Sequence, residues 1–242
     1  MACALSLGTL ACSGADVQDD TTPPAAGSSS TDASSASASS SGGGEFMGQP
    51  ATHWIQQLDG GEDAAERTRA VSALASIGPG VDGVTEALVG ALADDEALVK
   101  TGANRTLTRF GPAVAPVLVD TLDNHANAAV RAGVAPVLGN WAADADVNAA
   151  LCRALLEDED AAVRTAAARG LTVAGADAVA AVGALTEALE EDESTDVRQF
   201  AALALGRIGP AAAEAIPTLE AAEQDPDRTV ANAARSALRQ IR

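Results

Sequence analysis

A period of about 33 residues runs through most of this 242-residue chain. Segments of the form Val-Arg-x-x-Ala-x-x-x-Leu, or close to it, can be aligned with their first residues at positions 66, 99, 130, 163, 197 and 230. Position 66 is Glu, Lys100 stands in place of the Arg, and Val230 is followed by Ala231. Eight residues after each of them stands a leucine: Leu74, Leu107, Leu138, Leu171, Leu205 and Leu238. Self-similarity at a fixed period of this size is typical of proteins that stack copies of one supersecondary unit. The sequence therefore predicts about six stacked units.

Each unit reads as two helices joined by an acidic turn. The second helix has apolar residues at offsets 0, 4, 7 or 8, and 11, which place them on one helical face. Glycine, often followed by proline, ends this pattern and supplies the left-handed position at which helices stop: Gly78, Gly111, Gly175 and Gly209. Ala and Leu dominate the units, and both favour helix. We expect an all-α fold.

This pattern resembles the HEAT repeat family, in particular the short HEAT-like units of phycobilisome lyases, and the resemblance covers residues 49–242. It implies a right-handed α-α superhelix of about six two-helix repeats, in a domain spanning 47–242. It also implies a ladder of Asp and Arg residues between successive units, with the Asp six residues before the Arg. The positions that match are Asp94, Lys100, Asp158, Arg164, Asp192 and Arg198. The third unit has His125 in place of the Asp, and the sixth has Ala231 in place of the Arg.

The first 46 residues differ in composition from the repeats. Residues 1–12 are uncharged, mostly apolar and end in Leu10-Ala11-Cys12, which resembles a bacterial lipoprotein signal and implies lipid on Cys12. No basic residue precedes the apolar run, so another export route, or a cytoplasmic protein with an accidental apolar tail, stays open. Residues 13–46 are rich in Ser, Gly and Ala, a composition that favours a disordered linker.

Charge and residue inventory narrow the functional classes. The formal charge of −19 disfavours nucleic acid as a partner, because phosphate binding needs a basic surface. The two histidines, His53 and His125, have no second ligand at metal-binding spacing, and Cys152 is the only cysteine of the repeats. The acidic turns lack the spacing of a calcium loop. We therefore expect no catalytic residues, metal or cofactor. No stretch reaches 18 apolar residues, so we also expect no membrane-spanning helix.

Basic side chains recur on the second helices, at or near offsets 6 and 10. In HEAT-like solenoids these helices line the inner face. The candidate partner-binding residues are Arg69, Arg105, Arg109, Arg169, Arg207 and the apolar Phe200. Such a row would suit a carboxylate-bearing partner. The alternative is that long Arg side chains simply cover apolar area on an exposed face.

The function predicted from these features is a non-catalytic protein-binding scaffold at the cell envelope, with an unidentified protein partner. The alternative is a lyase-type or chaperone partner that acts on a modified protein, by analogy with the bilin lyases. A nucleic-acid enzyme resembling the HEAT-like DNA glycosylases is disfavoured by the charge.

Overall fold

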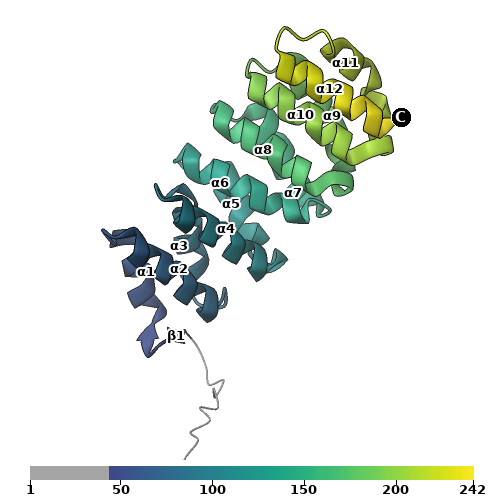
Figure 1. The fold of residues 1–242 in the computed structure, drawn as a ribbon. Coiled ribbons are helices and arrows are strands. Elements are labelled where there is room, and N and C mark those ends of the chain that lie inside the picture. Colours follow the sequence, from purple (N-terminus) through teal and green to yellow (C-terminus); the bar gives the residue numbers. More distant parts are fainter. Residues whose placement is uncertain (1–43) are drawn as a thin grey trace, which may run out of the picture. The chain divides into compact units, whose positions relative to one another are not determined.

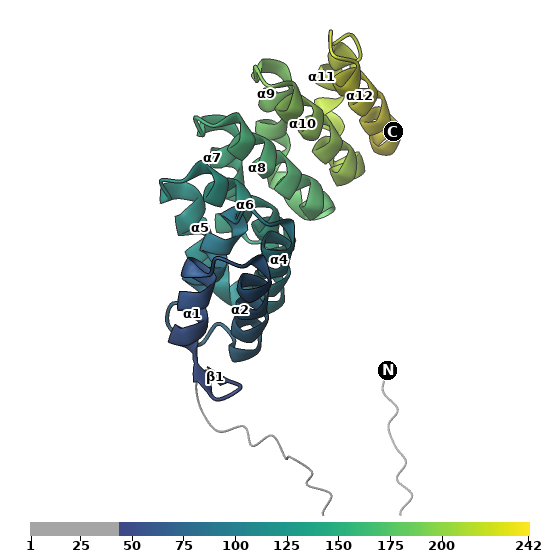
Figure 2. The same ribbon diagram turned by 60° about the vertical axis from the view of Figure 1, so that its left-hand side comes forward.

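The computed structural model describes residues 44–242, which form a row of paired helices (Figures 1 and 2). The first helices of the pairs are α1 (Ala51–Gly60), α3 (Val84–Gly90), α5 (Ala115–Asn124), α7 (Ala145–Glu157), α9 (Val182–Glu191) and α11 (Ile216–Ala222). The second helices are α2 (Ala64–Ile77), α4 (Ala97–Phe110), α6 (Ala128–Leu138), α8 (Ala161–Ala174), α10 (Thr195–Ile208) and α12 (Arg228–Ile241). The six pairs confirm the all-α superhelix expected from the period.

Short 3₁₀ turns complete several connections between the helices. They are η1 (Ala91–Ala93), η2 (Pro112–Val114), η3 (Gly139–Trp141), η4 (Gly175–Ala181) and η5 (Gly209–Ala215). Even-numbered helices lie along one side of the row and odd-numbered helices along the other (Figure 2). The row bends toward the even-numbered side, which we call the inner surface.

The helix ends follow from local sequence chemistry. Helices α2, α4, α8 and α10 end immediately before the predicted glycines, and each of those glycines has a positive φ that other residues rarely adopt. At the other end, the Asp63, Asn127, Asp160 and Asp227 side chains each accept a hydrogen bond from a backbone N–H of the first turn. The acidic turns are therefore also capping segments.

The core is a continuous column of aliphatic side chains between the two helix layers. Five of the six aligned leucines, from Leu74 to Leu205, are fully buried, and Leu238 is nearly so. Burying one such side chain contributes roughly 1.5–3 kcal/mol. Alanines between the leucines let neighbouring helices approach closely. The leucine columns identified from the period thus form the centre of the fold.

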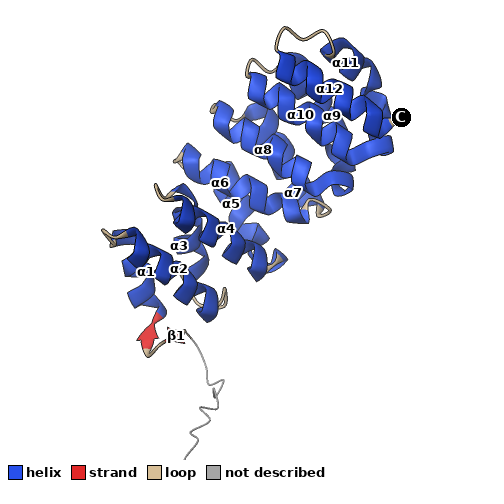
Figure 3. Cartoon of the chain, viewed as in Figure 1, coloured by secondary structure: helices blue, strands red, loops and turns tan. Residues whose placement is uncertain are grey.

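A short hairpin precedes the first helix pair and is the only β-structure in residues 44–242 (Figure 3). Its strands β1 (Glu45–Phe46) and β2 (Gln49–Pro50) pair antiparallel. The Phe46 ring meets the buried Trp54 edge-on, at 5.9 Å between ring centroids, and the Trp54 Nε1–H donates to the Phe46 carbonyl. The hairpin therefore packs against the first helix of the first pair.

The third unit departs from its neighbours. Helix α6 contains Pro136, ends at Leu138 and continues as a 3₁₀ turn, so Trp141 lies outside the α-helical part in which the repeat pattern places it. Helix α8 packs very closely here: a Cβ on Gly170 would lie 2.6 Å from the Ala135 carbonyl oxygen. The third unit thus lacks the Gly-Pro sequence that ends the second helix in other units, and it packs closely against the fourth unit.

One stretch of the described residues, Ala161–Glu191, is long and apolar enough by length and composition to cross a membrane. It consists of α8, η4 and α9, and the backbone leaves the helical path at Gly175, whose φ is +56°. Both helices take their places in the stacked pairs. The stretch is a bent part of the solenoid and not one straight helix.

Candidate functional site

Arg–Asp ion pairs join successive units along the turn edge of the solenoid. Each Arg donates Nε and Nη2 to the two carboxylate oxygens of an Asp in the next unit, over 2.7–3.3 Å. The Arg Nη1 donates to a backbone carbonyl six residues earlier in its own turn. We call these pairs the ladder: Arg67–Asp94, Arg131–Asp158, Arg164–Asp192 and Arg198–Asp225.

The ladder carboxylates Asp94, Asp158 and Asp225 have pKa values below the ordinary value for Asp. The Arg67 guanidinium holds the pKa of Asp94 below its ordinary value through their hydrogen bonds, and Arg198 does the same to the pKa of Asp225. Burial acts to raise the pKa of Asp158, but hydrogen bonds from Arg131 and from the Asp160 amide outweigh it, and the pKa is lowered. Each Asp also accepts the N–H two residues on, so it orders its own turn.

Three ladder members, Arg67, Arg131 and Asp225, were not among the residues assigned to the ladder from the sequence. The aligned dipeptides Glu66-Arg67 and Val130-Arg131 contain two of these arginines, but neither has an Asp six residues before it. The true pairing runs forward, from an Arg to the Asp of the following unit, about 27 residues later. Sequence spacing within one unit could not reveal a contact between units.

The ladder is interrupted between the second and third units. Lys100 stands at the Arg position and His125 at the Asp position, and Lys100 forms no ion pair with another described residue. His125 keeps one part of the Asp role, because its Nδ1 accepts the N–H of Asn127 at 3.1 Å. The turn is preserved while the connection between units is lost.

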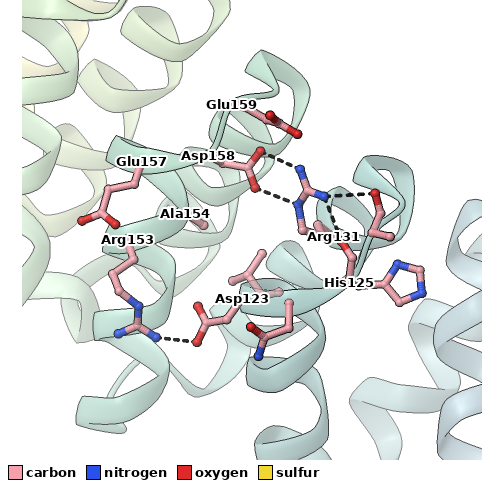
Figure 4. A pocket seen from close by; sticks show the side chains of 11 residues that line it. Asp123, His125, Arg131, Arg153, Ala154, Glu157, Asp158 and Glu159 are labelled. Carbon is pink, nitrogen blue, oxygen red and sulfur yellow. Dashed lines mark hydrogen bonds and ion pairs between the residues drawn. The ribbon is translucent and has the colours of Figure 1, made fainter.

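A polar pocket of about 680 Å³ lies beside the ladder between the third and fourth units (Figure 4). Arg131 points to Asp158 and Arg153 points to Asp123, while the His125 ring turns away from both pairs. The two arginines are thus already paired. Across residues 44–242, no group of three or more His, Cys, Asp or Glu residues is placed to hold a metal ion.

Charge is sharply divided between the two sides of the solenoid. Every basic residue of the chain except Arg153 and Arg242 lies in an even-numbered helix. Helices α4, α6, α8 and α12 contain no Asp or Glu at all. Apart from Glu66 in α2 and Asp196 in α10, the acidic residues lie in the odd-numbered helices, the turns and the N-terminal segment. A strongly acidic chain therefore has a basic inner surface.

The predicted partner-binding arginines all lie in these inner helices. The Arg69, Arg105, Arg169 and Arg207 side chains are exposed, and none forms an ion pair with another described residue. Arg109 differs, because its Nη2 donates to the Ala75 carbonyl at the end of α2, over 2.7 Å. Arg109 is therefore tied to a neighbouring helix.

Phe200 and Arg169 form a pair on the inner surface. The Arg169 guanidinium carbon lies 5.5 Å from the centroid of the half-buried Phe200 ring, a cation–π contact between α8 and α10. A groove of about 590 Å³ runs beside this pair, from Lys100 on α4, across α6, to Arg169 on α8 and Asp196 at the start of α10. Leu98, two residues before Lys100 in α4, is 73% exposed, which is unusual for so large an apolar side chain.

The remaining candidate groups do not converge on a catalytic arrangement. The Cys152 thiol on α7 is half-buried and donates to the Asn148 side chain, and burial raises its pKa. A raised pKa leaves less thiolate, which is the reactive form. His53 packs edge-on against Trp54 at the first helix, 5.0 Å between ring centroids. Cys12 lies outside the described residues.

Known structures share this architecture. One chain of the phycocyanin lyase CpcE–CpcF complex from Nostoc sp. PCC7120 matches 64% of this chain and 97% of its own length, at 20% identity and a TM-score of 0.55. Escherichia coli YibA matches 74% of this chain at 22% identity and a TM-score of 0.54. Kap95p, from a complex with RanGDP, matches 77% at 16% identity and a TM-score of 0.52. The alignments span 64% of YibA and 25% of Kap95p.

No curated protein matches the sequence. HEAT repeats are recognised over residues 115–182 and 150–239, which together make up more than half of the chain. The aligned period, the six helix pairs and the ladder between units agree with that match. The chain belongs to the HEAT repeat family.

Proposed function

We propose that this protein is a non-catalytic scaffold that holds a partner protein on its inner surface, at the cell envelope. The HEAT-repeat solenoid is a fold suited to protein–protein interaction, because its long surface follows from stacking alone. The observation that carries the proposal is the division of charge. Exposed basic side chains that form no ion pair with another described residue lie in the even-numbered helices, and the apolar Leu98 in α4 is exposed as well, which suits a binding surface.

The envelope part of this proposal rests on the N-terminal sequence. A lipid on Cys12 would attach the chain to the membrane through the residues that precede the hairpin. The inner surface would then meet partners close to the membrane. Mass spectrometry of the native N-terminus tests this directly, and a Cys12→Ser variant should leave the membrane fraction. An unmodified Met1 on the native protein would remove the envelope from the proposal.

Photo-crosslinking from single positions tests the choice of surface. A crosslinking residue at Ala162, exposed on α8, should capture a protein in cells of the native host. The same residue at Asp146, exposed on the outer helix α7, is the matched control and should capture little. Charge reversal of Arg105, Arg169 and Arg207 to Glu should abolish the Ala162 product. Equal capture from both positions would reject the inner surface as the binding site.

The alternative of a lyase-type partner has no specific support in the site geometry. The likeness to CpcE–CpcF is one of fold, at 20% identity. Cys152 is the only cysteine among the described residues, and its half-buried thiol with a raised pKa suits packing better than attack on an acceptor. Full partner function in a Cys152→Ser variant would exclude a thiol mechanism.

A further inference from the structure

We propose that the groove across α6 binds an extended, acidic segment of the partner protein. This inference rests on the proposed function and deepens it, since it names the chemistry of what the inner surface holds. It depends on three features: the shape of the groove, its unpaired bases and the distribution of charge over the rest of the molecule.

The floor of the groove is made by small side chains. Helix α6 contributes Ala129, Ala132, Gly133 and Pro136, and the long Lys100 and Arg169 side chains flank them from α4 and α8. Gly133 itself cannot carry a side chain without displacing Leu92, because an added Cβ would lie 2.6 Å from the Leu92 Cβ. The result is an apolar trough of about 590 Å³ in which a peptide backbone can approach α6 closely.

Two basic side chains line the trough, Lys100 from α4 and Arg169 from α8, and a single carboxylate, Asp196 at the start of α10, lies at the α8 side. Neither basic side chain forms an ion pair with another described residue. Phe200 beneath the Arg169 guanidinium restricts its position, so less conformational freedom is lost when it pairs with a carboxylate. Lys100 is free because the ladder is interrupted at His125. Lys100 therefore adds a positive charge to the inner surface.

The spacing of the walls favours an extended occupant. Adjacent packed helices are about 8–10 Å apart, so two such steps from α4 to α8 cover about 16–20 Å. An extended chain advances about 3.3 Å per residue, so about five or six residues span the trough. Carboxylates that far apart would reach Lys100 and Arg169 together, with small apolar residues facing the floor.

The distribution of charge favours a negatively charged partner segment. No Asp or Glu lies in α4, α6 or α8, whereas the outer helices and the turns are acidic. An acidic segment is therefore repelled from most of this protein and attracted to the trough. A basic segment would be drawn to the outer helices instead.

Fluorescence anisotropy with the full chain tests the proposal. The probe is a short fluorescein-labelled peptide in which Glu and Ala alternate, and the control peptide has Gln at every Glu. We expect only the Glu peptide to bind, with weaker binding as salt increases. Arg169→Glu and Lys100→Glu should each raise its Kd about tenfold or more, equivalent to loss of one charge-assisted contact. Ala129→Trp, which is neutral and fills the floor, should also weaken binding.

Arg239→Glu is the matched control, because Arg239 is an exposed and unpaired base of the described region in the last turn of α12, outside the groove. Its Kd should stay within about twofold of the parent. Circular dichroism should show the same helix content for all variants. Equal weakening by Arg239→Glu, or binding of the Gln peptide, would overturn the groove as an acidic-segment site. Tighter binding of a peptide of residues 13–32 would assign the groove to this chain's own acidic segment and overturn an external occupant.

The outcome can be separated from that of the proposed function. If Ala162 crosslinks a partner but the Glu peptide does not bind, the acidic-segment inference fails and the scaffold stands. If the peptide binds in the groove and no partner crosslinks there, the scaffold proposal fails instead.

Discussion

The Arg131 guanidinium forms two parallel hydrogen bonds with the Asp158 carboxylate, at 2.8 and 2.9 Å, and joins the third unit to the fourth. A third hydrogen bond runs from Arg131 to the His125 carbonyl. The two side chains are 10% and 9% exposed, so most of their charge is removed from water. Geometry of this kind makes an ion pair specific for one register of the two units.

Removing one partner of this pair should destabilise the protein. We expect Arg131→Ala to lower the free energy of unfolding by about 2 kcal/mol, because Asp158 then stays largely buried without its counter-charge. The control is Arg153→Ala, which breaks the more exposed pair with Asp123 and should cost less than about 1 kcal/mol. Urea unfolding followed by circular dichroism measures both. Equal losses would show that burial does not distinguish the two pairs.

Acidification should weaken the ladder. The pKa of Asp225 is lowered by Arg198, so its stabilising effect is present above the unfolded pKa of about 3.9 and is lost as pH falls through the folded value. In Arg198→Gln the pKa of Asp225 should return toward its ordinary value. The free energy of unfolding should then decline less steeply between about pH 5 and pH 3 than in the parent.

Urea unfolding at several pH values in that range measures the slope. Arg239→Gln removes the same charge from an arginine that contacts no described carboxylate, and it should keep the parent slope. An Arg198→Gln slope equal to that of the parent would show that the ladder does not carry the acid sensitivity.

The sequence predicted the fold because its signals lie within single helices and recur in every unit. The Leu74 and Leu107 columns and the Gly78 and Gly111 stops are local signals, and the structure has the corresponding cores and helix ends. The ladder was only partly foreseen, because Arg67 and Asp94 meet between units. These side chains are also largely buried, which spacing along the sequence does not show.

The sequence predicted the basic residues of the candidate site but not the groove that they line. The arginine row follows from helical offsets, so Arg105 and Arg169 were found. Lys100 was assigned to the ladder, and only the absence of a carboxylate at position 125 leaves it on the groove wall. The trough itself depends on how α6 sits between its neighbours, which no spacing within one helix reveals.

Restoring the missing rung should stabilise the junction between the second and third units. In the double variant Lys100→Arg, His125→Asp, the new pair would stand where the other units have Arg and Asp. We expect the free energy of unfolding to rise by about 1 kcal/mol, and a double-mutant cycle should assign most of the gain to coupling between the two positions. Purely additive effects would mean that the units do not align at this junction as they do elsewhere.

Close packing between α6 and α8 leaves no room for a side chain at Gly170. In an ordinary helix Gly→Ala stabilises, by about 0.5–1 kcal/mol. Gly170→Ala should do the opposite, because its Cβ would lie 2.6 Å from the Ala135 carbonyl oxygen and force the helices apart, at a cost of about 1–3 kcal/mol. Gly183 in α9 has no atom within 4 Å of the same added Cβ, so Gly183→Ala is the matched control and should be neutral or stabilising. Thermal unfolding of both variants measures the difference. A stable Gly170→Ala protein would require α6 and α8 to lie farther apart than they do here.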